Sequence, residues 1–234
     1  MTTQTPQPPR ADVADMSDVS DVLAELAALD DPKVRAINER HGDDHGVNLT
    51  ALRAVAKRLK TNHELAQHLW ATGDGAARLV ALLIARPKLF GADELDAMLR
   101  EANGTKVHYW LINYVVKKSA HKEALRQRWF DDPDPAVASA GWELTTERVH
   151  KNPEGLDLPG LLDLIEQQMK DAPDPLQWAM NETLAQIGIH HPALRARAIG
   201  IGERLEVLKD YPTAPNCTSP FAPTWIAEMV SRQG

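Results

Sequence analysis

The chain has 234 residues, of which 43% are hydrophobic and 25% charged, so it is long enough to bury a substantial core and has the composition of a soluble globular protein. No run of residues approaches the roughly 20 apolar residues that cross a bilayer, and the polar, acidic start lacks the basic region and apolar core of a secretory signal. Cys217 is the only cysteine, which excludes an internal disulfide and favours a reducing, cytoplasmic location.

The net charge of −7 argues against a general nucleic-acid binder, but it is unevenly distributed. Residues 1–50 carry 4 Lys and Arg against 10 Asp and Glu, whereas residues 51–234 carry 22 against 23. The body of the chain is therefore near neutral, and acidic faces elsewhere can balance one basic face.

Helical patterns follow one another along nearly the whole chain. Residues 1–17 contain Thr, Gln, Pro and Asp and little to bury, so we expect a disordered tail there. Asn48 and Asn62 are predicted N-caps of two early helices. Alternating runs of Val, Ile and Tyr are nearly absent, so we predict no sheet. The expected helices cover residues 49–59, 63–71, 74–87, 91–104, 106–118, 119–129, 134–150, 158–170, 174–188, 191–207 and 224–232.

A faint internal repeat supports a more specific architecture. DDPDPAVASAGWEL (131–144) aligns with DAPDPLQWAMNETL (171–184) at an offset of 40, and each begins D-x-P-D-P. Proline in the first turn of a helix costs no hydrogen bond. A period near 40 in an all-helical chain indicates HEAT-like helix pairs stacked into a solenoid, although two similar helix starts by chance would give the same pattern.

We predict one domain over residues 18–234. It includes a proline-rich loop, residues 209–223, and a C-terminal helix. The loop carries aromatic neighbours, so we expect it to be ordered and to pin Phe221 and Trp225 against the body.

The order of these segments resembles the bacterial DNA alkylation repair family, the AlkD-like HEAT-repeat DNA glycosylases. The segments that carry the resemblance run from residue 45 to about residue 210: GVNLTALRAVAKRL, HELAQHLW, GAARLVALLIARP, an aromatic helix, and LQWAMNETLAQIGIHHPALRARAIGIGERL. The resemblance implies an all-α, curved solenoid whose concave basic face binds double-stranded DNA. Active members release N-alkylated purines. For this chain we expect no cofactor, and we expect a monomer.

The family's catalytic pattern begins with a Trp and an Asp four residues apart on one helix. Carried over, these positions fall on Tyr109 and Asn113, and an alignment shifted by one residue gives Trp110 and Tyr114 instead. One helical turn separates the members of each pair, so both side chains would reach the same cleft. Neither alignment supplies an acid.

Two further family positions are also substituted. The position of an Arg falls at about Ser139, and that of a second Trp falls at Glu182, with Trp178 one turn earlier. A carboxylate about 4 Å from a unit charge contributes roughly 4 kcal/mol at an effective dielectric near 20, which is about a thousandfold in rate. The substitutions therefore predict that glycosylase activity is weak or absent, unless Glu182 supplies the missing charge from the opposite wall of the cleft.

We expect five basic residues to contact the phosphate groups of DNA. Lys117, Lys118 and Lys122 surround a turn before a helix start, a favourable place for phosphate, and Arg195 and Arg197 follow a later helix junction. The alternative for each is a solvated charged face or a capping role.

The loop HGDDHG (41–46) holds two His and two Asp but lacks the spacing of a metal site, so we expect no metal. Nucleotide-binding glycine motifs are also missing from the sequence.

Two alternatives to a repair enzyme remain: a non-catalytic protein that recognises DNA structure, and a helical protein-interaction module without a DNA role.

Overall fold

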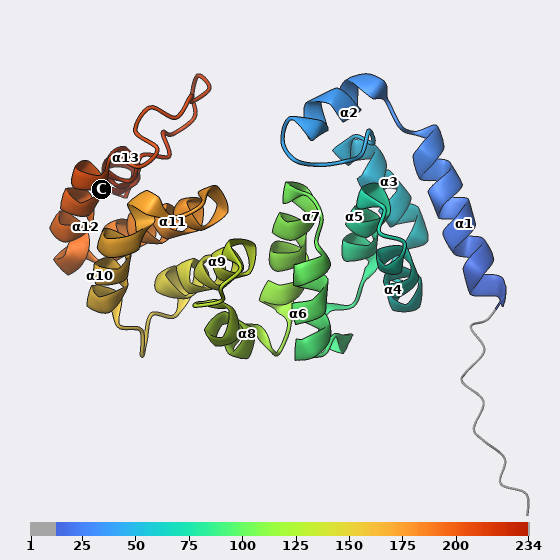
Figure 1. Cartoon of the computed structure of the whole chain (residues 1–234), viewed down its shortest axis with the longest axis horizontal. Helices are drawn as coiled ribbons and strands as arrows, with labels where there is room; N and C mark the ends of the chain where they lie inside the picture. The colour runs from blue at the N-terminus through green and yellow to red at the C-terminus, as the bar shows by residue number, and fades with distance from the viewer. Residues whose placement is uncertain (1–12, 234) are drawn as a thin grey trace, which may run out of the picture. The chain divides into compact units, whose positions relative to one another are not determined.

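The computed structural model describes the backbone of residues 13–233 and the side chains of residues 18–233 (Figure 1). Thirteen α-helices lie in this range, which contains no strand, so the prediction of an all-α chain is confirmed. Helix α1 (Val13–Ala28) begins within the segment predicted to be a tail, and residues 1–12 lie outside the described part. None of the described helices is long and apolar enough to cross a membrane.

Contacts within the chain group the helices into two compact units, which we call unit 1 (Met1–Ala120) and unit 2 (His121–Gly234). The prediction of a single domain over residues 18–234 stays a prediction.

Unit 1 is built around α5, whose apolar sequence GAARLVALLI lies buried against α3, α4 and α7. Leu79 and Val80 on α5 are fully buried. The predicted caps are confirmed, because the Asn48 side chain accepts a hydrogen bond from Ala51 N and the Asn62 side chain accepts one from Leu65 N. The elements of unit 1 after α1 are α2 (Pro32–Glu39), α3 (Leu49–Leu59), α4 (His63–Ala71), α5 (Gly75–Ile84), η1 (Pro87–Leu89), α6 (Ala92–Glu101), α7 (Thr105–Trp110), η2 (Leu111–Val115) and η3 (Val116–Lys118).

Unit 2 is built around its two longest helices, which pack against each other. They start at the two D-x-P-D-P segments, and the buried hydroxyls of Thr146 and Thr183 join them at 2.6 Å. The sequence repeat therefore corresponds to a structural one. The elements of unit 2 are α8 (Lys122–Trp129), α9 (Pro135–Lys151), α10 (Leu158–Gln168), η4 (Met169–Asp171), α11 (Asp174–His190), α12 (Pro192–Leu205) and α13 (Ala222–Ser231).

The proline-rich loop connects α12 to α13 (Figure 1). The buried Asn181 on α11 donates a hydrogen bond from Nδ2 to the carbonyl oxygen of Pro220 at 2.8 Å. Helix α13 then returns onto α11 and α12, and Trp225 packs against the core of unit 2. The loop is thus attached to the body at its C-terminal end.

Candidate nucleic-acid interface

The aromatic helix changes its winding where the site residues lie. It starts as the α-helix α7, continues as the π-helical turn η2 and ends as the 3-10 turn η3. Single π-helical turns are rare and frequently occur at functional sites. Residues 102–122 around it contain four lysines and no Asp or Glu, so the segment is locally basic in an acidic protein.

Asn113 lies within the π-helical turn, and both ends of its amide are hydrogen-bonded. Its Nδ2 donates to the carbonyl oxygen of Tyr109 at 2.8 Å, and its Oδ1 accepts from Lys117 Nζ at 2.7 Å. Next to it, Lys118 Nζ lies 5.6 Å from the centroid of the Tyr114 ring, a cation–π contact. The site therefore holds a fixed neutral amide with ammonium groups beside it.

The aromatic rings of this helix divide between surface and core. Tyr109 is 56% exposed, whereas Trp110 is 4% exposed. The Trp110 ring meets Tyr114 edge to face at 5.2 Å, and the Arg53 guanidinium carbon lies 5.5 Å from its centroid. Trp110 is therefore a core residue of unit 1, and we leave it out of the candidate interface. Tyr109 keeps an accessible ring.

A second basic site lies on the surface of unit 2, around a pocket of about 530 Å³ between α8 and α9. Four cations surround two carboxylates there, which leaves two more positive than negative charges. We call this set the α8/α9 cluster: Lys122, Glu123, Arg126, Glu147, Arg148 and Lys151.

The two carboxylates hold the cations in place. Glu147 accepts from Lys122 at 3.5 Å and from Lys151 at 2.8 Å. An ammonium group has three donors, so both lysines keep donors for a phosphate.

Glu123 accepts from Arg126 at 2.9 Å and from Arg148 at 2.7 Å. Its hydrogen bond from Arg126 is the main reason why its pKa falls to about 2. Glu123 therefore stays ionised and joins α8 to α9 at neutral pH.

Three other residues that were predicted to contact DNA form bonds within the protein. Ser139 is 2% exposed, and its hydroxyl donates to the carbonyl oxygen of Ala136 at 2.7 Å. Arg195 donates to the carbonyl oxygens of Gly188 and Ile189 at 2.8 and 3.1 Å, where α11 ends. We therefore leave Ser139 and Arg195 out of the candidate interface.

Arg197 is the third of these residues. It donates to the carbonyl oxygen of Pro159 at 3.2 Å and forms an ion pair with Asp163. A second carboxylate, that of Glu166, lies 3.8 Å away. The guanidinium is thus matched by acidic groups of α10, and it is also left out.

Trp178 and Glu182 lie one turn apart on α11, so they share a face of that helix. Trp178 is 39% exposed and meets Tyr211 edge to face at 5.2 Å. Tyr211 was not predicted as a site residue, and the only feature of the sequence that pointed to it was an aromatic residue beside a proline.

A cleft formed by Asn113 and Glu182 stays a prediction, because these residues belong to different units.

The loop HGDDHG anchors the start of the aromatic helix. Asp43 is buried, and its Oδ1 accepts from Lys106 N at 2.7 Å in the first turn of α7. Within the described residues, no group of three or more His, Cys, Asp and Glu is arranged to hold a metal ion.

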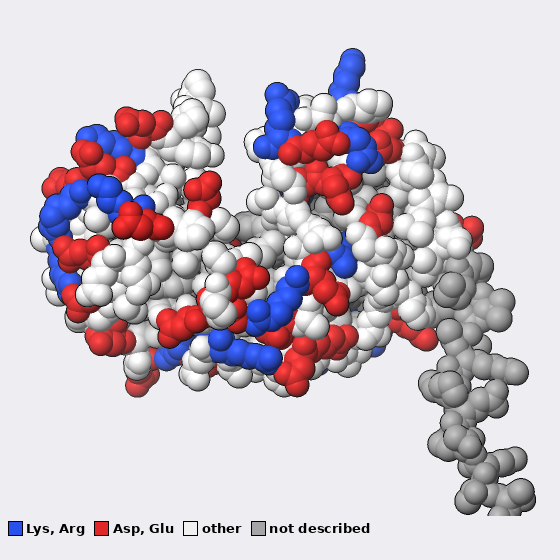
Figure 2. Space-filling model, in the orientation of Figure 1, with Lys and Arg blue, Asp and Glu red and all other residues white. Residues whose placement is uncertain are grey.

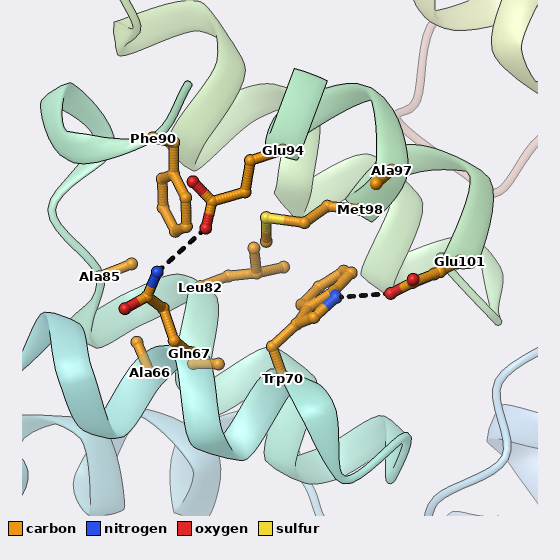
Figure 3. Close-up of a pocket in the computed structure, with 11 residues that line it drawn as sticks. Ala66, Gln67, Trp70, Leu82, Ala85, Phe90, Glu94, Ala97, Met98 and Glu101 are labelled. Carbon is orange, nitrogen blue, oxygen red and sulfur yellow. Dashed lines mark hydrogen bonds between the residues drawn. The ribbon is translucent and has the colours of Figure 1, made fainter. Parts of the chain in front are cut away.

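A smaller pocket of about 190 Å³ lies between α4, α5 and α6 in unit 1 (Figure 3). Gln67 Nε2 donates to Glu94 at 3.0 Å, and Trp70 Nε1 donates to Glu101 at 3.2 Å (Figure 3). The Arg78 guanidinium carbon lies 4.8 Å from the centroid of the Trp70 ring. These bonds join α4 to α6, so the two carboxylates have a structural role.

On the face drawn in Figure 2, basic and acidic side chains are interleaved. The predicted basic concave face stays a prediction.

The all-α fold is that of the HEAT-like helical-repeat proteins. Residues 22–226 match the family described as DNA alkylation repair enzyme, and the chain belongs to that family. The resemblance noted in the sequence is thereby confirmed.

A solved structure from "a new family of proteins related to the HEAT-like repeat DNA glycosylases with affinity for branched DNA structures" has a TM-score of 0.71 to this chain. The two are 24% identical, and the match covers 92% of this chain and 94% of the other. At this identity the likeness shows the fold.

Two proteins of Listeria are similar in sequence, and both are described as uncharacterized. The protein of Listeria innocua is 23% identical over 220 residues, which is 89% of this chain and 95% of the relative. The protein of Listeria monocytogenes is 24% identical over 187 residues, which is 75% of this chain and 80% of the relative.

Proposed function

We propose that this protein binds DNA, prefers branched DNA to plain duplex, and releases alkylated bases weakly or not at all. The observation that carries the proposal is the pair formed by Asn113 and Lys117 on the π-helical turn. A neutral amide stands where the family resemblance places a carboxylate, and an ammonium group lies 2.7 Å from its oxygen.

This pair is unsuited to breaking a glycosidic bond by the family's mechanism. As that bond breaks, positive charge grows on the deoxyribose, and a carboxylate about 4 Å away stabilises it by roughly 4 kcal/mol at an effective dielectric near 20. An amide offers only a dipole, and a lysine cation opposes the growing charge. The same cation favours a phosphate group, so the site is better suited to holding DNA than to cutting it.

Three observations support DNA as the partner. The acid-free segment of residues 102–122 carries four lysines, and the α8/α9 cluster has an excess of two cations. The structural neighbour comes from proteins described as having affinity for branched DNA structures. The family itself is one of DNA alkylation repair.

The test has two parts. Binding is measured to a four-way junction and to a plain duplex of equal length, with wild type and Lys117→Gln. We expect tighter binding to the junction and a loss of about fivefold or more in the variant, as for one charged hydrogen bond to phosphate. Release of 7-methylguanine from methylated DNA is measured in single-turnover conditions, and we expect little.

A rapid release of 7-methylguanine by the wild type would overturn the catalytic part of the proposal. Equal affinity for junction and duplex would overturn the preference for branched DNA. No DNA binding at low salt would leave the protein-interaction module as the better interpretation.

A further inference from the structure

An aromatic pocket of about 320 Å³ lies within unit 2, between α11 and the proline-rich loop that leads to α13. Its walls are Trp178 of α11, Tyr211 of the loop and Trp225 of α13. We call it the aromatic pocket. Its volume is at the lower end of the range for sites that hold small organic molecules.

Two of its rings are open to solvent. Trp178 is 39% and Tyr211 49% exposed, and their planes meet at 70° with centroids 5.2 Å apart. Only six large hydrophobic side chains are exposed among the described residues, and these two lie in contact. Adjacent exposed aromatic rings mark a binding surface more often than single ones do.

The pocket is held in shape by bonds from buried or neighbouring groups. Asn181, which is 2% exposed, donates to the carbonyl oxygen of Pro220 at 2.8 Å, and the Thr218 hydroxyl donates to Glu228 of α13 at 2.9 Å. Prolines at 212, 215 and 220 restrict the loop further. A binding partner would therefore meet a preformed cavity.

The chemistry of the walls selects the occupant. The lining, all of it in the described part of the chain, contains no charged side chain, and its polar side-chain groups are neutral, among them the hydroxyls of Thr213 and Ser219. Such walls fit a neutral, flat ligand with a polar edge and exclude a phosphate or a carboxylate. A nucleobase has this chemistry, and its flat face stacks on Trp and Tyr.

We propose that the aromatic pocket holds one unpaired nucleobase of the bound DNA. The proposal rests on the proposed function, because it needs DNA as the partner. A base at a bulge or a branch point has already lost its pairing, so its transfer into a pocket costs less than extrusion of a paired base. The pocket therefore gives a physical reason for a preference for branched DNA.

The test uses a duplex with a single-base bulge, in which the bulged base is the fluorescent analogue 2-aminopurine. Stacking on Trp178 and Tyr211 quenches this base. We expect quenching with the wild type and a loss of about tenfold or more in affinity for bulged DNA with Trp178→Ala and with Tyr211→Ala, at unchanged affinity for plain duplex. Trp178→Phe keeps a stacking face and should retain most of the affinity and quenching.

Leu89→Ala is the matched control, since Leu89 is an exposed large apolar side chain of unit 1. It should behave as the wild type does. If the aromatic variants bind bulged DNA as tightly as the wild type, the pocket does not hold a base, while DNA binding stands. If they lose affinity equally for bulged and plain duplex, the rings contact the backbone and the inference is wrong. If neither the wild type nor any variant binds DNA, the inference and the proposed function are both wrong.

Discussion

Asn113 illustrates how a single atom can change what a site stabilises. An aspartate at this position would present a negative charge, whereas the amide presents an oxygen that is already bonded to Lys117 at 2.7 Å. The backbone carbonyl of Tyr109 fixes the amide nitrogen, so the side chain has a defined orientation. The charge of this site is thus set by Lys117 and Lys118.

Asn113→Asp is the first prediction at this scale. The new carboxylate would stand at the family's catalytic position, although its pairing with Lys117 would offset part of the roughly 4 kcal/mol that a free carboxylate offers. We expect single-turnover release of 7-methylguanine to rise by about tenfold or more. Gln167→Glu adds the same charge at an exposed position of α10, outside the candidate interface, and should leave the rate unchanged. An unchanged rate in Asn113→Asp would place residue 113 away from the reacting sugar.

His45 gives a prediction about pH. It is 3% exposed, and burial lowers its pKa below the usual value of 6.5. Below that value the unfolded chain binds a proton that the folded chain does not, so the free energy of unfolding falls as the pH drops from 6.5 to the lower folded pKa.

Thermal unfolding at about pH 7.5 and about pH 5.5 checks this expectation. The wild type should unfold at a lower temperature at the acidic pH, and His45→Gln should reduce the difference. His41→Gln, at an exposed position of the same loop, should keep it. An equal pH dependence in wild type and His45→Gln would show that His45 does not contribute.

At the scale of elements, the position of the α8/α9 cluster depends on how closely two helices approach. Gly141 of α9 faces the backbone where α8 ends, and a Cβ built there would lie 2.6 Å from Phe130 N and 2.7 Å from the Trp129 carbonyl carbon. No larger residue fits without separating the helices. Glu123 and Arg148 can pair across this contact because the glycine lets the backbones meet.

Gly141→Ala should therefore destabilise unit 2. Alanine gains up to about 1 kcal/mol in helix propensity, but overlap with fixed backbone atoms costs more, and we expect a net loss of about 2 kcal/mol in the free energy of unfolding. Urea unfolding measures it.

Gly91→Ala is the control for this change, since its Cβ would meet nothing within 4 Å and its φ is −76°. Gly91 is the N-cap of α6, where alanine is a poorer residue than glycine, so this change should cost less than about 1 kcal/mol. Similar losses in the two variants would contradict the packing argument.

At the scale of the whole molecule, a net charge of −7 coexists with local clusters of cations. Residues 1–50 hold most of the excess of acid, so the remainder of the chain can present basic segments to a polyanion. The strength of such binding depends on the phosphates contacted rather than on the total charge.

The salt dependence of DNA binding tests this view. Each phosphate contact contributes about −0.9 to the slope of log K against log salt, so the double variant Lys117→Gln, Lys118→Gln should reduce the slope by about 2. Lys33→Gln with Lys88→Gln removes the same charge from exposed positions outside the candidate interface and should change the slope little. Equal slopes for both double variants would mean that η3 does not contact phosphate.

Much of the fold could be predicted from the sequence because it depends on local patterns of residues. The helices, the caps at Asn48 and Asn62 and the repeated starts of α9 and α11 depend on residues a few positions apart, and each is confirmed. The candidate site was less predictable, because a residue's accessibility depends on distant neighbours. Trp110 and Ser139 are buried, while Tyr211 is exposed beside Trp178.

The amino-acid sequence by itself determined the helical class, the family resemblance and the loss of the acid at residue 113. These depend on the spacing of apolar residues, the order of the helical segments and the identity of single residues, all of which can be taken from the sequence. Only the tertiary structure decided which side chains meet. Trp178 of α11 meets Tyr211 of the proline-rich loop, and Asn181 of α11 bonds to Pro220, although the members of each pair lie far apart in the chain. Contacts of this kind depend on packing between segments far apart in the chain, which no local pattern records.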